Sequence, residues 1–329
     1  MWPFRLISQQ QRYRSWRSLG GLFAVALSLA LMFQACGSPV NETASNNGQN
    51  NGQSIDQTAD TPAQTTDTKT NGTLNALDKE HKGDEPIATP AAMAEPTVPV
   101  VGEMVEYATI DGQAVMGYLA RPETPKSDAL PAIMAIHEWW GLNDNIKAIA
   151  RRLAGEGYTV LAIDLYGGQV ASDPEQAKEL MRTVMDNPGP AQDNLTLADE
   201  FLTEDYSAPK LGVIGWCFGG NWALRSGLLL ENLDAIAIYY GQLILQPEAL
   251  DGLQAPVIGF FGEDDSSIPV EDVENFESAL NRLNKPVEIH LYAGAGHAFA
   301  NPSGNNYEAE AAEDAWKKTT AFFAEQLKG

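Results

Sequence analysis

The chain has 329 residues, with 44 acidic and 21 basic side chains and a formal net charge of −23. A chain with so negative a field is repelled by nucleic acid and by anionic lipid headgroups, which excludes binding to either as its main function. Its two cysteines, Cys36 and Cys217, are far apart in the sequence, and the fold is not expected to rely on an internal disulfide.

Residues 1–35 have the layout of an export signal. They carry four arginines and no acid, followed by the apolar stretch "LFAVALSLALMF" and the small residue Ala35. This stretch is shorter than the roughly 20 residues that a membrane-spanning helix needs, so no stable transmembrane segment is expected. The segment therefore predicts export to the bacterial cell envelope.

The sequence "FQAC" resembles a bacterial lipoprotein signal, in which the cysteine becomes the lipidated first residue of the mature chain. The resemblance implies a lipid on Cys36 and anchoring to a membrane. Phe33 stands where such signals usually have leucine. The alternatives are ordinary secretion after cleavage at Ala35 and an uncleaved anchor.

Residues 36–101 read as a disordered, low-complexity tether. The stretch "NNGQNNGQSIDQTADTPAQTTDTKT" has almost no large apolar residue, so it cannot bury enough surface to offset the entropy lost on ordering. Without residues 1–35 the chain keeps 17 basic residues against 44 acidic ones, a net charge of −27. Membrane association is then expected to depend on the lipid and not on a basic patch.

Patterned sequence over 102–329 predicts one domain. Two alternating runs around Asp111-Gly112 predict a β-hairpin. Apolar runs then alternate with helical patterns: strands are expected at "PAIMAIH", "TVLAIDL", "KLGVIGW", "LDAIAIYYG", "APVIGFFG" and "VEIHLYAG", and helices at "NDNIKAIARRLAGEGY", "DPEQAKELMRTVMDN", 190–203, "GGNWALRSGLLL", 270–283 and 307–327. This alternation predicts an α/β fold with a mostly parallel sheet, helices on both faces and an N-terminal hairpin. Functional sites in such folds gather beyond the carboxyl ends of the strands.

The motif "GWCFG" places Cys217 between a predicted strand and a predicted helix. This is the context of a nucleophile elbow, where small neighbours relieve a strained turn. Backbone N–H groups and the dipole at the helix N-terminus favour a thiolate there. A buried structural cysteine is the alternative.

An acid and a histidine follow in the chain order expected of a catalytic triad. The loop "GEDDSSIP" after one strand offers Glu263, Asp264 and Asp265, and "GAGHAF" after the next presents His297. A histidine there can accept the thiol proton while a carboxylate fixes its tautomer. Considered separately, His297 could be a packed loop histidine, and the three acids could form a solvated loop without a catalytic role.

The chain from about Gly102 onward resembles the dienelactone hydrolase family, a branch of the α/β-hydrolase fold with a cysteine nucleophile. The motifs "IHEWWG", "GWCFGG", "GEDDSSIP" and "GAGHAF" carry the resemblance. It implies a triad of Cys217, Asp265 and His297, because the family's aspartate lies four residues before a proline, here Pro269.

The resemblance also implies a role for the "HEWWG" loop. Glu138 matches the family's glutamate that shares the thiol proton at rest, and the backbone N–H groups of Trp139 and Phe218 would form the oxyanion hole. His137 is expected to orient the loop. Substrate contacts are expected from Trp140 and Trp216, with core packing as the alternative, and from Asn301, which lies near the place of a family arginine that holds the substrate carboxylate.

The predicted function is hydrolysis of a small ester or lactone through a thioester acyl-enzyme, of the carboxymethylenebutenolidase type. Because neither "HAFAN" nor "DLYGGQV" offers the family's arginine, a neutral substrate is expected. Neither a metal nor a nucleotide cofactor is expected, since the four histidines show no ligand spacing and no Gly-rich phosphate loop occurs. A non-catalytic, surface-tethered binding protein on the same scaffold is the main alternative, and a redox role for Cys217 is another.

Overall fold

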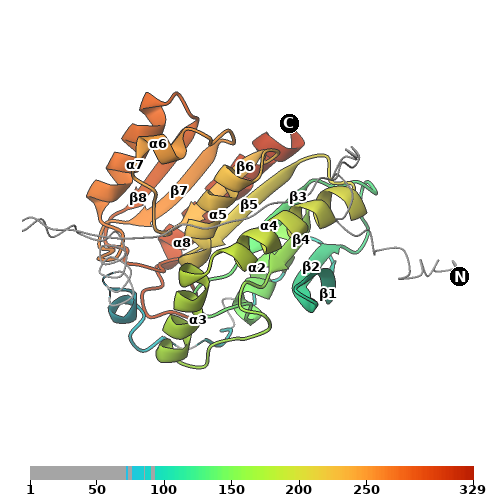
Figure 1. Ribbon diagram of the computed structural model, residues 1–329, viewed down its shortest axis with the longest axis horizontal. Helices are drawn as coiled ribbons and strands as arrows, with labels where there is room; N and C mark the ends of the chain where they lie inside the picture. Colours follow the sequence, from blue (N-terminus) through green and yellow to red (C-terminus); the bar gives the residue numbers. More distant parts are fainter. Residues whose placement is uncertain (1–71, 73–75, 85, 90–92) are drawn as a thin grey trace, which may run out of the picture. The chain divides into compact units, whose positions relative to one another are not determined.

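The structure is a computed structural model that describes residues 72, 76–84, 86–89 and 93–329 (Figure 1). All of them belong to one compact unit, Ala59–Gly329. The export signal, Cys36 and residues 36–71 of the predicted tether lie outside the described residues, so these predictions stay predictions. Within the described residues, no helix is both long enough and apolar enough to cross a membrane.

A single eight-stranded sheet organises the domain. The strands pair in the order β1-β2-β4-β3-β5-β6-β7-β8. The pairs β1–β2 and β2–β4 are antiparallel, and the remaining five pairs are parallel. Their bounds are β1 Val100–Ile110, β2 Gln113–Pro122, β3 Ala132–Ile136, β4 Thr159–Ile163, β5 Leu211–Trp216, β6 Ala235–Tyr239, β7 Val257–Gly262 and β8 Val287–Tyr292. The predicted mostly parallel sheet is confirmed.

The N-terminal hairpin is confirmed in register as well as in position. β1 and β2 pair from Ile110 opposite Gln113 outward, and the two turn residues Asp111 and Gly112 have φ values of 50° and 78°. A two-residue turn with both residues in the left-handed region matches the right-handed twist of the flanking strands. Aspartate and glycine are among the residues that tolerate this conformation, which is why the sequence signal was reliable.

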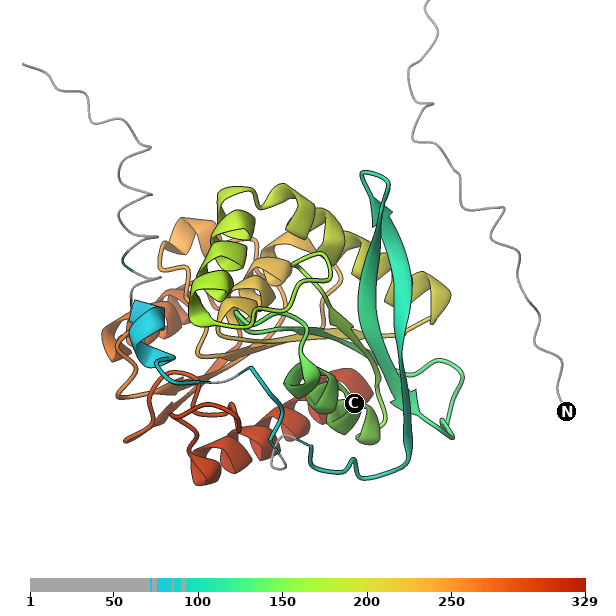
Figure 2. The same ribbon diagram turned by 90° about the horizontal axis from the view of Figure 1, so that it is seen from below.

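Helices cover both faces of the sheet. Figure 2 shows α2 and α8 on one face and α4, α5 and α7 on the other. The guanidinium of Arg152 in α2 lies 4.0 Å from the ring centre of Trp316 in α8, which ties the two helices of the first face together. The bounds are α2 Asp144–Gly155, α3 Pro174–Asp186, α4 Gly189–Glu200, α5 Phe218–Leu229, α6 Pro247–Leu250, α7 Val270–Arg282 and α8 Ala309–Lys328.

The strands of the central sheet form the core. Every residue of β3, β4, β5, β6 and β7 is buried. A parallel sheet that is covered on both faces has no polar side, so its strands are apolar throughout and do not alternate. The two outer strands β1 and β8 are only partly buried, and they do carry polar residues.

The structure differs from the sequence prediction at the start of the domain. β1 begins at Val100, and residues 76–80 of the predicted tether are helical. Leu77 is 4% exposed and His81 is fully buried against the domain. The polar composition of the region concealed these few residues, whose burial depends on contacts with loops far along the chain. The short α6 and a π-helical turn at Phe201–Asp205 were also not predicted.

The turn from β5 to α5 is as tight as the predicted elbow requires. Cys217 joins the two elements with φ 53°, a left-handed conformation that a residue with a side chain adopts only under strain. A Cβ on Gly215 would lie 2.0 Å from the carbonyl oxygen of Gly219. Glycine at 215 is therefore a steric requirement of the turn.

We expect Gly215→Ala to lower the free energy of unfolding by on the order of 3 kcal/mol, because the clash is with backbone that cannot move without opening the elbow. Gly252→Ala is the matched control, since a Cβ there meets nothing within 4 Å. Thermal and denaturant unfolding of both variants would measure the difference. Equal stability of the two variants would contradict the proposed constraint.

Candidate active site

The elbow holds the Cys217 sulfur at the carboxyl end of β5 and the N-terminus of α5. The backbone N–H of Cys217 donates to Tyr239 O at 3.0 Å, and Cys217 O accepts from the N–H groups of Gly220 and Asn221. The residue is only 3% exposed. The strand, turn and helix predicted around this cysteine are therefore all present.

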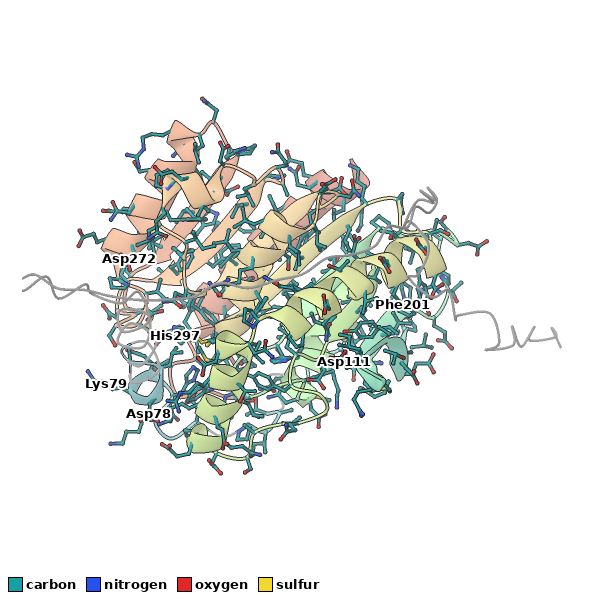
Figure 3. All side chains as sticks on the ribbon, in the orientation of Figure 1. Asp78, Lys79, Asp111, Phe201, Asp272 and His297 are labelled. Atoms are coloured by element: carbon teal, nitrogen blue, oxygen red, sulfur yellow. The ribbon has the colours of Figure 1, made fainter. Side chains whose placement is uncertain are left out.

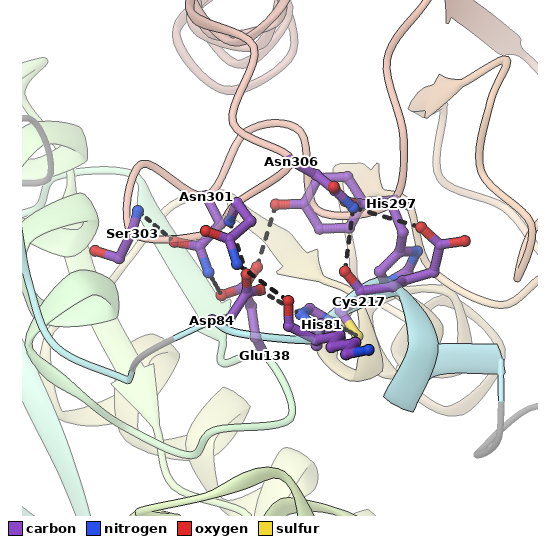
Figure 4. A network of polar contacts seen from close by, with 12 residues as sticks. His81, Asp84, Glu138, Cys217, His297, Asn301, Ser303 and Asn306 are labelled. Carbon is purple, nitrogen blue, oxygen red and sulfur yellow. Dashed lines mark hydrogen bonds and ion pairs between the residues drawn. The ribbon is translucent and has the colours of Figure 1, made fainter.

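His297 and Asp265 meet beside this elbow from the loops after β8 and β7. Nδ1 of His297 lies 2.7 Å from Asp265 Oδ2, and both side chains are buried (Figure 4). Oδ1 of Asp265 accepts hydrogen bonds from the N–H groups of Ser267 and Ile268 at 2.8 and 3.0 Å. A carboxylate only accepts hydrogen bonds, so Nδ1 of His297 carries the proton and Nε2 is left for the site. Asp264, by contrast, is exposed.

Three side chains from distant parts of the sequence converge at the sulfur. Side-chain atoms of His81, Cys217 and His297 lie within 4.8 Å of one another, and Nε2 of His81 lies 3.9 Å from Cys217 Sγ. Bonds of about 2.0 to 2.3 Å to a tetrahedral zinc ion would bring such atoms to about 3.6 Å. The three groups are close enough for hydrogen bonds to the sulfur and could also hold a metal ion, although their spacing in the sequence gave no hint that they meet.

The charges of the site favour a thiolate. Burial alone raises the pKa of the Cys217 thiol, but the imidazoles of His297 and His81 favour the charged form more strongly and bring the pKa down to about 6. Burial lowers the pKa of His297, whereas the negative charges of Asp265 and Cys217 outweigh burial and raise it well above its ordinary value. These shifts favour a thiolate at Cys217 and an imidazolium at His297 near neutral pH.

Glu138 lies near the sulfur but is bound to other residues. One carboxylate oxygen accepts from the Tyr240 hydroxyl at 3.2 Å and the other from Asn301 Nδ2 at 2.8 Å. Within the described part of the chain it makes no hydrogen bond to Cys217. Burial and the nearby Cys217 charge raise the pKa of Glu138 to about 7. Its predicted sharing of the thiol proton stays a prediction.

His137 has the contacts of a residue that orients the loop. Its Nε2 accepts from the backbone N–H of Leu165 at 3.1 Å, so the ring is neutral and Nδ1 donates to Glu138 O at 2.6 Å. Burial lowers the pKa of this histidine, in keeping with the neutral form. The ring thus joins the loop after β3 to the loop after β4.

The two predicted oxyanion donors are the backbone N–H groups of Trp139 and Phe218. Phe218 is the first residue of α5, where a backbone N–H has no partner inside the helix. Among the described residues, no acceptor is bound to either N–H. Their predicted role as oxyanion donors stays a prediction.

A pocket reaches Cys217 and His297, with about 350 Å³ of free space that includes open solvent at its mouth. Apolar side chains form much of its wall, with two amides among them: Leu77, Met181, Met185, Phe218, Tyr240 and Ile268 line it together with Asn221 and Gln242. No lysine or arginine occurs among these lining residues.

The predicted substrate contacts lie elsewhere. Trp216 lines a separate cavity, because it precedes Cys217 in the chain and successive strand residues face opposite sides of the sheet. Trp140 is packed edge-on against Trp139 with ring centres 5.0 Å apart, and Asn301 is bound to Glu138. None of the three is among the residues that line the cavity beside the sulfur, so their predicted contact with substrate stays a prediction.

Sequence reasoning missed three residues of the site: His81, Asp84 and Tyr240. The stretch "KEHKGDEP", which contains His81 and Asp84, differs from the Asn- and Thr-rich sequence before it, and this was the available signal. Tyr240 gave none, since it continues the apolar run of β6. Its role at Glu138 follows from the tertiary structure alone.

The strand order, the elbow and the loops after β7 and β8 define an α/β-hydrolase. The chain belongs to the dienelactone hydrolase family, whose model matches residues 115–327. It is 34% identical over 235 residues to the protein usf of Aquifex pyrophilus, covering 69% of this chain and all of that one. It is 31% identical over 249 residues to a protein of Saccharolobus solfataricus provisionally named carboxymethylenebutenolidase, covering 64% of this chain and 94% of that one.

A solved structure supports the same assignment. A provisionally named dienelactone hydrolase from Klebsiella pneumoniae superimposes with a TM-score of 0.61 at 27% identity, over 69% of this chain and 99% of that one. The family resemblance seen in the sequence is therefore confirmed, and the chain is a hydrolase of the dienelactone hydrolase type.

We expect Asp265→Asn to raise the pKa of Cys217 above its value of about 6. Loss of the carboxylate charge lowers the pKa of His297, so less imidazolium is present to stabilise the thiolate. The measurement is the pH midpoint of iodoacetamide alkylation, followed on the peptide that contains Cys217. Asp264→Asn, an exposed neighbour, is the control and should leave the midpoint in place. An unshifted midpoint in Asp265→Asn would show that this carboxylate does not set the charge of the dyad.

Proposed function

We propose that this hydrolase cleaves a small ester or lactone through a Cys217, His297 and Asp265 triad. The observation that carries the proposal is the hydrogen-bonded His297 and Asp265 pair set beside a cysteine of lowered pKa at a nucleophile elbow. A thiolate is the nucleophilic form of cysteine, and an oriented imidazole can transfer protons to and from the reacting groups.

In the proposed reaction, the Cys217 thiolate attacks the substrate carbonyl carbon. The backbone N–H groups of Trp139 and Phe218 stabilise the oxyanion, and loss of one such donor typically costs roughly 3 to 4 kcal/mol of barrier stabilisation. The C–O bond then breaks, His297 gives its proton to the leaving oxygen, and a thioester remains. His297 next takes a proton from water, the hydroxide attacks the thioester, and the C–S bond breaks to release the acid and restore the thiolate.

The cavity supports a neutral, apolar substrate. Its wall has no lysine or arginine among the lining residues, so a substrate carboxylate would be buried without a partner charge. The side chains of Leu77, Met181 and Met185 suit a short acyl group. The activity proposed is thus a carboxylic ester hydrolase related to carboxymethylenebutenolidase, the name carried by the Saccharolobus relative, with neutral esters or lactones as substrates.

A binding protein without turnover is the alternative on this scaffold. It would have no use for a buried histidine held by a carboxylate, since these groups cost free energy to bury and serve proton transfer. The retained pair of His297 and Asp265 therefore favours an enzyme.

We expect Cys217→Ala to abolish hydrolysis of p-nitrophenyl acetate while the circular dichroism spectrum and melting temperature stay close to those of the unchanged chain. The reason is that the variant has no nucleophile to form the thioester. In the unchanged chain, mass spectrometry after rapid acid quench should find one acetyl group on the peptide that contains Cys217. Cys36→Ser, which removes the other cysteine, should retain the activity. Full turnover in Cys217→Ala would refute the nucleophile assignment.

We propose further that the enzyme is exported and held at a membrane by a lipid on Cys36. The basic residues and the apolar stretch of 1–35, followed by "FQAC", support this proposal. The strongly negative charge of the remaining chain leaves the lipid as the expected means of attachment.

We expect Cys36→Ser to release the protein from the membrane fraction of the bacterial host, because the variant has no thiol to accept the lipid. The measurement is the share of protein in membrane and soluble fractions after lysis, with Cys217→Ser as the matched control that should stay in the membrane. Unchanged membrane retention of Cys36→Ser would indicate an uncleaved anchor instead.

A further inference from the structure

A segment outside the matched family region reaches the nucleophile. The family model begins at residue 115, whereas residues 76–84 place the His81 ring against the active site. Figure 3 shows the helical residues Asp78 and Lys79 near His297. The His81 ring is fully buried; it stacks on Trp139 with ring centres 4.3 Å apart and meets the His297 ring edge-on at 5.3 Å.

His81 is a second imidazole in hydrogen-bond contact with the sulfur. Its Nε2 lies 3.9 Å from Cys217 Sγ, and its Nδ1 lies 2.8 Å from Asp84 Oδ2 (Figure 4). Because the Asp84 carboxylate can only accept, Nδ1 carries a proton and Nε2 is directed at the sulfur. His81 and Asp84 therefore repeat, at a second position beside the thiol, the arrangement of His297 and Asp265.

This second pair is held by the same loops that carry the triad. Ser266, next to Asp265, donates to the Glu80 carboxylate through its hydroxyl and backbone N–H. Beyond His297, the backbone N–H of Asn305 donates to Asp84 Oδ1 at 2.7 Å, and Asn306 Nδ2 donates to Glu80 O at 3.2 Å. The position of His81 is thus set by contacts on both sides of the sulfur.

Glu138 and His297 also lie near the sulfur, but neither replaces His81 as the hydrogen-bond partner of the thiol. The two oxygens of Glu138 are taken by Tyr240 and Asn301. Nε2 of His297 is buried and has no hydrogen-bond partner within the described residues. His297 also lies beside the sulfur, and its charge helps to lower the pKa of Cys217. Because no hydrogen bond holds its Nε2 in the described structure, His297 can meet an approaching substrate while His81 already contacts the thiol.

We propose that His81, oriented by Asp84, is a further catalytic residue that holds Cys217 as a thiolate in the resting enzyme. The thiol proton is transferred so that Nε2 of His81 donates to the sulfur anion, and His81 keeps this proton through the reaction cycle. The proton for the leaving oxygen comes from His297, which recovers one from water. In this division of roles both imidazoles stabilise the resting thiolate, but His81 keeps its proton throughout whereas His297 also transfers protons.

The charges that face the sulfur agree with this assignment. Burial lowers the pKa of His81, but the hydrogen bond to Asp84 and the neighbouring thiolate outweigh it and raise the pKa. The remaining titratable groups that face Cys217 are Tyr166 and Tyr240, both with a pKa well above the ordinary value and so neutral, and Glu138. Only the two histidines supply positive charge to the thiolate among these groups.

The test is the pH dependence of Cys217 alkylation in the full chain, read on the peptide that contains Cys217 so that Cys36 does not interfere. The unchanged protein should show a midpoint near pH 6. We expect His81→Ala and His81→Gln to raise this midpoint by about one pH unit, which is roughly a tenfold loss of thiolate below the midpoint. Asp84→Asn should shift it in the same direction by less. EDTA in every buffer removes metal ions that sulfur and imidazole would bind.

His290→Ala is the matched control. His290 is also paired with a carboxylate, with Nε2 2.7 Å from Glu288 Oε1, but it lies on β8 and makes no contact with the sulfur in the described structure. Its removal should leave the midpoint unchanged. Melting temperatures would show that all four variants are folded, and the midpoint is the deciding quantity because removal of the His81 ring also admits reagent more freely.

Ester hydrolysis gives a second measurement, and here the inference rests on the proposed function. We expect His81→Ala to lower kcat/KM about fivefold at pH 6 and to approach the unchanged enzyme at pH 9, where the thiol ionises without help. An unshifted alkylation midpoint in both His81 variants would overturn the inference. A higher kcat/KM of His81→Ala together with an unshifted midpoint would also overturn it. That result would indicate that residues 76–84 only obstruct access to the active site. Failure of the unchanged enzyme to hydrolyse any ester would count against the proposed function alone, because the alkylation midpoint does not depend on turnover.

Discussion

The buried contact between His297 and Asp265 is the interaction on which the proposed thiolate and imidazolium of this site depend. Neither ion is stable alone in the interior, since transfer of a single charge from water to a buried position costs far more than a domain can recover. The Asp265 carboxylate makes the pair possible because its Oδ2 accepts a hydrogen bond from His297 Nδ1 at 2.7 Å. The elbow supplies the rest, because it fixes Cys217 at the N-terminal end of α5, where the helix dipole favours negative charge.

The sheet explains why such a pair can be assembled from distant parts of the chain. Parallel strands end at the same edge, so the turns after β5, β7 and β8 meet although they are separated by helices. All residues of the strands from β3 to β7 are buried, and this rigid core holds the loops at fixed separations. A reactive thiol and two loop side chains therefore need no flexible adjustment to meet.

The segment at residues 76–84 extends the site beyond the family domain. Through His81 and Leu77 it contributes both an imidazole contact to the sulfur and part of the wall of the cavity. Its hydrogen bonds go to the loops after β7 and β8, so this segment and the triad loops stabilise one another. A chain without this segment would have a more open cavity and one imidazole fewer at the nucleophile.

The sequence by itself determined the sheet, the hairpin and the elbow, because each depends on local rules: buried parallel strands are apolar throughout, a left-handed turn selects Asp-Gly, and a crowded turn selects glycine. It also gave Cys217, Asp265 and His297 through motifs at strand ends. Only the tertiary structure decided that His81 joins them, that Asn301 binds Glu138, and that Trp216 faces another cavity. These are contacts between residues more than a hundred positions apart, or facts of side-chain direction, and neither leaves a periodic pattern in the sequence.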